Sequence, residues 1–327
     1  MDYRSLPKIE LHLHLDCSLS YKVVHQIDPS ITEEQYKESF IAPPKCTDLV
    51  DYLKRAVKGF ELMQTKEQLR LVTLDVLEQL DADNVVYAEI RFAPLLHIAK
   101  GLTPKEVVGA VNDAVEEGKK TYKVIAKLLL CTMRHYSEEQ SFQTVKLVEQ
   151  FKDTNVVGFD IAGDEAGFPI DAHKKAFQFA KANGIHCTSH AGEAKGADSV
   201  TETLDNFGPT RIGHGVRSAE KESVLQLLLD RDIHLEVCPT SNVQTNIFPS
   251  VKEHAIDKIY KKGVSLSVNC DCRTITPVTL TSEYASLEDA FGWNSTHFLR
   301  CNLEAIRHCF ADEATKEKLR AIVQKAY

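Results

Sequence analysis

Two histidines stand two residues apart near the start of the chain, in the run Ile9 to Asp16, which reads Ile-Glu-Leu-His-Leu-His-Leu-Asp. Successive side chains of a β-strand point to opposite faces, so His12 and His14 share one face and the leucines share the other. Two imidazoles at this spacing lie about 6 to 7 Å apart along a strand, which suits one metal ion. A pair of hydrogen-bonded histidines in a polar core fits the same pattern, so other residues must decide.

Further acid-base groups follow apolar runs later in the chain. His190 and Glu193 come at the end of one run, His214 at the end of the next, and Asp271 after a run near residue 268. Singly, each is more often an ordinary polar residue, and Glu193 also suits the first turn of a helix. Together, three histidines and an aspartate are the ligands of a divalent ion that keeps one position open for water. A further histidine could then take a proton from that water, and Glu193 could give one to a substrate.

The elements that must position these groups alternate regularly between strand and helix. Short apolar runs are expected as strands at 9–15, 85–92, 123–131, 156–161, 185–190, 210–214, 233–238 and 264–269. Helix-like segments lie between or after most of them, including 104–120, 138–152, 172–183, 219–230 and 282–291. Eight such units predict an α/β fold, the closed (β/α)₈ TIM barrel, in which catalytic groups lie at the carboxyl ends of the strands.

Two segments exceed the barrel pattern. Residues 17–84 are too long for one crossover and contain helical stretches at 49–63 and 66–80, so we expect an insertion over the barrel mouth, a candidate lid. The tail predicts two terminal helices, 296–310 and 312–326. No linker rich in Pro, Gly or Ser divides the chain, so residues 1–327 are expected to form a single domain.

Composition narrows the class of partner. The chain has a net charge of -8 and no run of basic residues, so neither nucleic acid nor a membrane surface is expected as a main partner. The first residues do not resemble a signal peptide, so we expect a cytoplasmic protein, a monomer or weak homo-oligomer. The nine cysteines include no Cys-x-x-Cys pair and are expected to be reduced.

Other histidines are expected to play no part in chemistry. His186 and His234 stand where predicted strands begin, which is the wrong end. Although His234-Leu235-Glu236 and Cys238-Pro239 superficially resemble the cytidine deaminase signature, no second cysteine completes that zinc site. The remaining ones show no clustering and are expected at surface or structural positions: His25, His97, His135, His173, His254, His297 and His308.

Several motifs in order along residues 6–275 make the chain similar to the adenosine deaminase family of metal-dependent barrel hydrolases. They are Leu-Pro-Lys-Ile-Glu-Leu-His-Leu-His-Leu-Asp at 6–16, Gly-Phe-Asp-Ile-Ala-Gly-Asp-Glu at 158–165, His-Ala-Gly-Glu at 190–193, Arg-Ile-Gly-His-Gly at 211–215 and Glu-Val-Cys-Pro-Thr-Ser-Asn at 236–242. The set is highly specific for the superfamily and less specific for the substrate.

The resemblance implies a ligand set and a reaction. One Zn²⁺ per chain would be held by four residues: His12, His14, His190 and Asp271. His214 would orient and deprotonate the water, and Glu193 would protonate purine N1 as C6 is attacked, with loss of ammonia. Gly163 would contact the purine through its backbone, and Asp16 would bind the ribose 5′-hydroxyl. The small-molecule partner would be a purine nucleoside, adenosine or 2′-deoxyadenosine, which also contacts His14.

Two cysteines depart from the family pattern. Cys17 stands where the family usually has Gly, and Cys272 where it usually has an acid that hydrogen-bonds purine N7. A thiol is a weak donor, so another purine, such as aminodeoxyfutalosine, adenine or an N6-substituted adenosine, is an alternative substrate. A catalytically weak purine-binding barrel is a further alternative. Because strands 1 and 8 are neighbours in a closed barrel, one hypothesis is that Cys17 and Cys272 face each other across the pocket, and the alternative is two unrelated thiols in tight turns.

Overall fold

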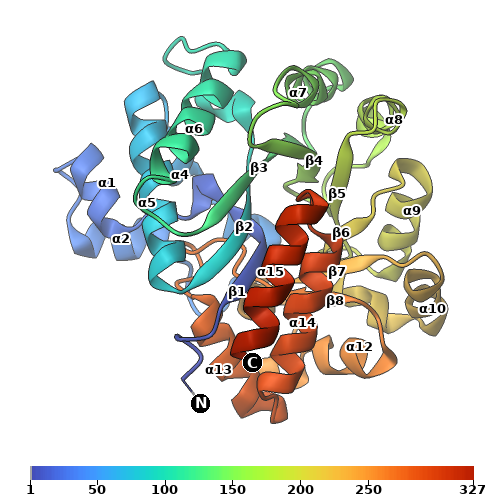
Figure 1. The fold of residues 1–327 in the computed structure, drawn as a ribbon. Helices are drawn as coiled ribbons and strands as arrows, with labels where there is room; N and C mark the ends of the chain where they lie inside the picture. The colour runs from blue at the N-terminus through green and yellow to red at the C-terminus, as the bar shows by residue number, and fades with distance from the viewer. Residues whose placement is uncertain (1) are drawn as a thin grey trace.

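Eight parallel strands form the centre of the computed structural model, which describes residues 2–327 (Figure 1). They pair in chain order: β1 (Lys8–His14), β2 (Val85–Phe92), β3 (Ile125–Met133), β4 (Val156–Ala162), β5 (His186–Ala191), β6 (Arg211–His214), β7 (His234–Val237) and β8 (Leu266–Val268). The ring closes because the backbone N–H of His14 donates to Asp271 O at 2.8 Å, and that of Asp271 donates to His12 O at 2.8 Å. The predicted (β/α)₈ TIM barrel is confirmed.

Helices connect the strands and cover the outside of the ring. They are α6 (Pro104–Gly118), α7 (Glu138–Gln150), α8 (Lys174–Ala182), α9 (Ala197–Phe207), α10 (Glu222–Asp230), α11 (Pro239–Gln244), α12 (Ile256–Lys262) and α13 (Leu280–Phe291), with short 3₁₀ turns η2 (Pro94–His97), η3 (Asp171–His173), η4 (Val216–Glu220) and η5 (Val251–Glu253). Thr103, Ser137 and Thr279 begin α6, α7 and α13 with a capping box, in which side chains satisfy the first free N–H groups of the helix.

The insertion after β1 is helical, as predicted. It contains η1 (Leu15–Cys17), α1 (Tyr21–Ile27), α2 (Glu33–Phe40), α3 (Leu49–Leu53), α4 (Ala56–Glu61) and α5 (Lys66–Ala82). The single helical stretch expected at 49–63 is wrong, because α3 and α4 are separate helices. Each is anchored on a different segment: Tyr52 of α3 hydrogen-bonds Thr276 at 2.7 Å, whereas Gly59 of α4 packs against the backbone of Asp16.

The two predicted terminal helices are present as α14 (Ser295–His308) and α15 (Glu313–Ala326). Both lie across the outside of the barrel near β1 in Figure 1. Ile306, Leu319 and Val323 from these helices form one apolar cluster with Ile9 and Leu11 of β1. The C-terminal segment therefore packs on the outward side of the strand that supplies the first two histidines.

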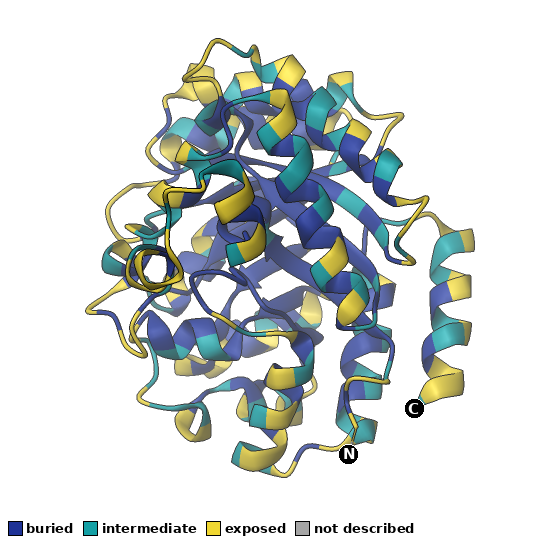
Figure 2. Ribbon diagram, turned by 90° about the vertical axis from the view of Figure 1, so that its left-hand side faces the viewer, coloured by how far each residue is buried: buried dark blue, intermediate teal, exposed yellow. Residues whose placement is uncertain are grey.

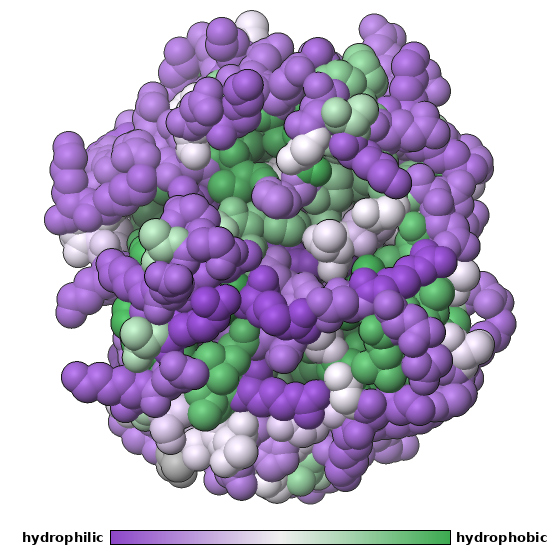
Figure 3. Space-filling view, turned by 45° about the vertical axis from the view of Figure 1, so that its right-hand side comes forward, coloured by the Kyte–Doolittle hydropathy of each residue, from purple (hydrophilic) through white to green (hydrophobic). Residues whose placement is uncertain are grey.

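Burial follows the layers of the barrel. Figure 2 shows the strands buried and the helices exposed on their outer sides only. On the face drawn in Figure 3 the outermost atoms are mainly hydrophilic, and hydrophobic atoms show mainly in the recesses. Among residues 2–327, no helix is both long and apolar enough to span a bilayer. Three exposed large hydrophobic residues, Val50, Val57 and Phe168, border one pocket, which is described in the next subsection.

Candidate active site

A pocket of about 460 Å³ lies at the carboxyl ends of the strands, in the size range of small-molecule sites. Its lining includes nearly all the site residues expected from the sequence: His14, Asp16, Cys17, Gly163, His190, Glu193, His214, Asp271 and Cys272. His12 lies fully buried behind this lining. A second pocket of about 710 Å³ shares Glu193 but contains none of the expected ligand histidines, so the smaller pocket is the candidate active site.

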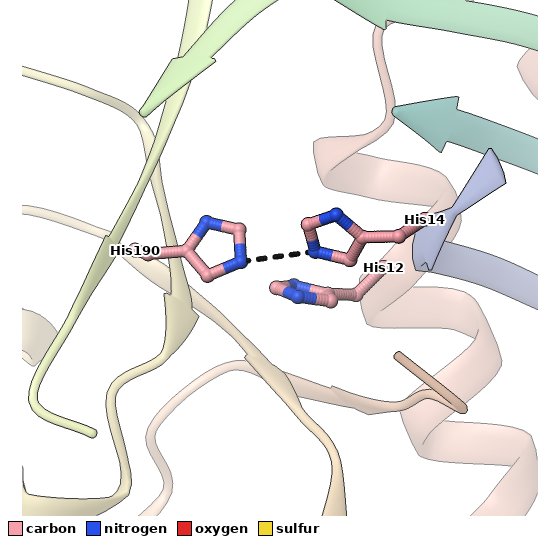
Figure 4. Close-up of side chains that lie close together, drawn as sticks. All are labelled: His12, His14 and His190. Carbon is pink, nitrogen blue, oxygen red and sulfur yellow. Dashed lines mark hydrogen bonds between the residues drawn. The ribbon is translucent and has the colours of Figure 1, made fainter. Parts of the chain in front are cut away.

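Three imidazoles converge at the floor of the pocket, as Figure 4 shows. Ring nitrogens of His12, His14 and His190 all lie within 4.8 Å of one another. His14 Nε2 is 3.2 Å from His190 Nε2. Asp271 adds a carboxylate oxygen, Oδ1, which lies 3.5 Å from His14 Nε2 and 3.7 Å from His12 Nε2. β1, β5 and the segment after β8 therefore bring the predicted ligand set together.

Buried carboxylates fix the protons on two of these rings. His12 Nδ1 lies 2.8 Å from Glu236, and His190 Nδ1 lies 3.1 Å from Asp160. Burial opposes ionisation of Glu236, but the neighbouring arginines lower its pKa to about 2. Burial likewise opposes ionisation of Asp160, but His190 and Arg91 hold its pKa below the usual value. Because ionised carboxylates only accept hydrogen bonds, both Nδ1 atoms donate, and both Nε2 atoms carry lone pairs.

The donor set fits a divalent metal ion. His12 Nε2 is buried and has no hydrogen-bond partner among the described residues. Burial lowers the pKa of His12 well below its usual value and that of His14 to about 4, so both rings stay neutral, the form that binds metals. The buried Nε2 of His12 and an oxygen of Asp271 thus converge on the His14–His190 pair, whose Nε2 atoms hydrogen-bond each other at 3.2 Å. A cation among them would be coordinated in place of that hydrogen bond, and the carboxylates behind the rings are the usual second layer of a zinc site.

Glu193 lies beside this cluster as a candidate proton donor. Its loop is held by Glu165, which accepts the backbone N–H of Gly192 at 2.8 Å and that of Glu193 at 2.9 Å. Burial raises the pKa of Glu193 well above its usual value, and the charges of Asp271 and Glu165 raise it further. This shift favours the protonated carboxyl group, the state needed for a general acid.

His214 faces Glu193 from the end of β6. Its Nε2 lies 3.6 Å from Glu193 Oε2, and its other ring nitrogen lies 3.1 Å from the amide of Asn242. His214 and Asp271 both adopt positive φ angles, 60° and 65°, which residues other than glycine rarely do. Such strain often accompanies functional positions, and here it occurs at two of the residues singled out from the sequence.

The two unusual cysteines lie together in the pocket wall. Cys17 and Cys272 belong to one apolar cluster with Leu49 and Tyr52. The Cys272 thiol donates to Asp271 Oδ1 at 3.3 Å. Burial raises its pKa well above the usual value, so it stays protonated. The thiols thus give the pocket a weakly polar wall beside a proposed ligand.

Gly163 and Asp16 lie on other parts of the lining. Gly163 has a φ of 100°, and a Cβ there would lie 3.2 Å from the Met133 side chain. Asp16 accepts the backbone N–H of Ala93 at 3.4 Å and lies 3.7 Å from His97 Nε2.

Several residues near the pocket escaped the sequence reasoning. His135 lines it, His97 contacts Asp16, and His254 hydrogen-bonds Asn242, the residue that holds His214. Ser241 donates to Asp271 at 2.7 Å. Ser241 and Asn242 belong to the family motif at 236–242, and this motif was the one sequence signal that could have placed them at the site. The three histidines follow no local pattern. His186 and His234 do lie at strand starts, outside the pocket lining.

Comparisons with known proteins point to one family and one fold. The sequence model of the family described as adenosine deaminase matches residues 7–326. An adenosine deaminase of Enterococcus faecalis is 36% identical over 330 residues, covering 99% of this chain and 98% of that protein. The solved adenine deaminase from Arthrobacter aurescens is 25% identical with a TM-score of 0.90, covering 98% of this chain and 99% of that one. The N6-methyl-AMP deaminase from Arabidopsis thaliana is 27% identical with a TM-score of 0.88, covering 99% and 98%.

Proposed function

The chain belongs to the adenosine deaminase family, and from this premise we propose that it deaminates a 6-aminopurine nucleoside by hydrolysis. The substrate is adenosine or 2′-deoxyadenosine, and the products are inosine or 2′-deoxyinosine and ammonia. One observation carries the proposal: a converging set of metal-ligand atoms and a buried carboxyl group with a raised pKa, that of Glu193, share one pocket.

Four residues would hold one zinc ion: His12, His14, His190 and Asp271. Zinc, when bound, supplies Lewis acidity that lowers the pKa of water towards 7. The chain's own residues supply the rest. Glu236 and Asp160 keep the ligand rings in the tautomer that presents a lone pair, and Ser241 holds the second oxygen of Asp271.

Glu193 is the proposed proton donor to the purine ring. Protonation of the ring nitrogen next to C6 makes that carbon more electrophilic, so the amino group is exchanged for oxygen more readily. A carboxylic acid can do this at neutral pH only if its pKa is raised, as burial does for Glu193. His214, across from Glu193, is placed to contact the attacking water.

The remaining lining residues would bind the nucleoside. Asp16 accepts a sugar hydroxyl, the backbone at Gly163 leaves room for the purine edge, and His14 contacts the substrate beside the metal. Cys17 and Cys272 contact the purine through polarisable sulfur rather than through a strong hydrogen bond.

The charges of the lining favour a nucleoside over a nucleotide. Besides the proposed proton donor and metal ligand, the carboxyl groups of Asp16 and Asp164 border the pocket, whereas Lys54 is the one lysine or arginine among the described residues of the lining. Lys54 already lies 3.4 Å from Asp51. Phosphate recognition normally uses arginine forks or several cations. A 5′-phosphate would therefore meet an acidic surface, unlike the substrate named for the Arabidopsis relative.

Ammonia release from a substrate panel tests the proposal. Zinc-loaded protein is assayed with adenosine, 2′-deoxyadenosine, adenine, N6-methyladenosine and AMP. We expect kcat/KM of at least about 10⁴ M⁻¹s⁻¹ for one of the two nucleosides. We expect a value for AMP at least about 100-fold lower, because each unpaired charge costs several kcal/mol.

A preference for AMP or adenine would overturn the substrate assignment. If no compound is deaminated although nucleosides bind, the enzymatic proposal itself fails. The same panel on Cys272→Asp tests the thiol wall: a restored acid should raise kcat/KM for adenosine about tenfold, since an unmet polar group costs about 1 to 3 kcal/mol. Cys272→Ser is the matched control for loss of sulfur alone.

A further inference from the structure

A backbone amide fixes the proton on a buried histidine next to the site. The N–H of Ile256 donates to His254 Nδ1 at 3.0 Å, and a backbone N–H can only donate. His254 is fully buried, and burial lowers its pKa to about 3, so the ring is neutral. A neutral imidazole has one N–H and one lone pair. Because Nδ1 accepts, the proton of His254 lies on Nε2.

That proton orients the side-chain amide of Asn242. His254 Nε2 lies 3.2 Å from the amide and donates, so the atom it meets is the oxygen Oδ1. The nitrogen Nδ2 then faces the other way, 3.1 Å from His214 Nδ1. The orientation follows from the Ile256 amide and does not depend on how oxygen and nitrogen are assigned in the side chain.

The same logic sets the tautomer of His214. An amide NH₂ only donates, so His214 Nδ1 accepts and holds no proton. A ring whose Nδ1 accepts carries its proton on Nε2, and in His214 that atom faces Glu193 Oε2 at 3.6 Å. His12 and His190 have the opposite arrangement, because their Nδ1 atoms donate to carboxylates and leave Nε2 lone pairs.

We propose that the relay from Ile256 through His254 and Asn242 locks His214 in the Nε2–H tautomer, so that His214 donates a hydrogen bond to the attacking oxygen rather than removing its proton. Asn242 and His254 are positioning residues. The direction of the hydrogen bond departs from the base role that family resemblance implies for His214. The role towards the attacking oxygen rests on the proposed function, whereas the tautomer does not.

One consequence concerns metal binding. His12, His214 and Cys238 form a second group whose donor atoms lie within 4.8 Å of one another. In the locked tautomer, Nε2 of His214 carries a proton and Nδ1 is engaged by Asn242. Neither nitrogen offers a free lone pair, so His214 stays outside the ligand set although it is equally buried.

The substitution Asn242→Asp tests the relay. An ionised aspartate accepts from both histidines, so His214 should shift its proton to Nδ1. Nitrogen-15 NMR of histidine-labelled protein, with the His214 signals assigned by loss in His214→Asn, should show Nε2 protonated in the wild type and Nδ1 protonated in the variant. We expect kcat for the nucleoside substrate to fall about 100-fold, as when a preorganised donor is removed, with KM changed less than about threefold. Asn206→Asp on α9, outside the pocket, is the matched control and should change neither readout.

A wild-type His214 with its proton on Nδ1 would overturn the proposal, as would an Asn242→Asp variant that keeps the wild-type spectrum and kcat. Should Asn242→Asp not fold, His254→Phe provides the second variant, since a phenyl ring can pack on Phe248 but frees the Asn242 amide to rotate. A mixture of His214 tautomers is then expected, and a single Nε2–H form contradicts the relay. Because NMR reads the tautomer without turnover, failure of the proposed function is seen separately, in the ammonia assay of the wild type.

Discussion

At the residue scale, two buried arginines organise the proposed metal ligands. Arg91 binds Asp160 at 2.8 Å and Glu236 at 2.6 Å, and Arg211 binds the other oxygen of Glu236 at 2.8 Å and Glu89 at 2.6 Å. All of these side chains are fully buried. Two of the carboxylates each hold a ligand histidine, so the network converts buried charge into fixed ring orientations.

Glu236→Gln should weaken zinc binding in addition to any loss of folding stability. The two oxygens of Glu236 accept hydrogen bonds from four side chains, whereas the glutamine amide has only one acceptor oxygen. His12 then loses the partner that fixes its tautomer. We expect the zinc dissociation constant, measured by chelator competition, to rise about 10- to 100-fold. Glu89→Gln is the matched control, because Glu89 also pairs with Arg211 but contacts no ligand histidine. Equal zinc affinities in the two variants would contradict this assignment.

Residue types predicted the metal ligands and the acid-base pair, but not the residues that hold these side chains in place. His12, His14, His190 and Asp271 could be named because strand periodicity places them at one rim. The contact of Glu236 with His12 spans 224 positions in sequence, and no local spacing encodes it. Relay contacts around Asn242 were missed for the same reason: they depend on how loops pack, not on repeats within an element.

At the element scale, strand positions were predictable to within two residues at most ends, because apolar β-branched runs mark buried parallel strands. The helical insertion was less predictable. Its stretch 49–63 contains no proline, yet it divides into α3 and α4, since packing against the barrel mouth overrides local propensity. These two helices supply Val50, Val57 and Phe60 to the pocket wall.

Gly59 holds α4 close to the site, and Gly59→Ala should displace the helix. An added Cβ would lie 2.1 Å from the carbonyl oxygen of Asp16, so α4 and η1 must separate. We expect a loss of about 1 to 3 kcal/mol in the free energy of unfolding and a several-fold higher KM for the nucleoside. Denaturant unfolding and steady-state kinetics provide the measurements.

Gly109→Ala in α6 is the matched helical control. A Cβ there would meet nothing within 4 Å, so the change should stabilise the protein by about 0.5 to 1 kcal/mol without affecting KM. Destabilisation of both variants alike would show that α4 is not uniquely constrained by its contact with Asp16.

At the scale of the whole molecule, the fold class was predictable because strand and helix alternate along the chain and right-handed crossovers leave few arrangements. The bonds that close the ring were not, since the backbones of His14 and Asp271 pair only in the finished barrel and lie 257 positions apart in the sequence. We propose that residues 1–327 form one domain, because the terminal helices pack on β1 rather than separately.

Global stability should carry a pH signature from Glu283 on α13. One oxygen of this buried carboxyl accepts the N–H of Thr240 at 3.2 Å, and the other has no partner among the described residues. Burial raises its pKa from 4.5 to about 8. Between these values the folded protein keeps a proton that the unfolded chain releases, so this group makes stability fall as pH rises from 4.5 to 8.

Glu283→Gln removes that cost, because the amide stays neutral at every pH. Relative to wild type, the variant should show little difference near pH 4.5 and an advantage of about 5 kcal/mol above pH 8. Urea unfolding at fixed zinc concentration across this range measures the difference, and shared effects of metal release cancel between the two proteins. Glu317→Gln makes the same chemical change on exposed α15 and should give a difference that does not vary with pH. A flat difference for Glu283→Gln as well would mean that the carboxyl is ionised in the folded protein.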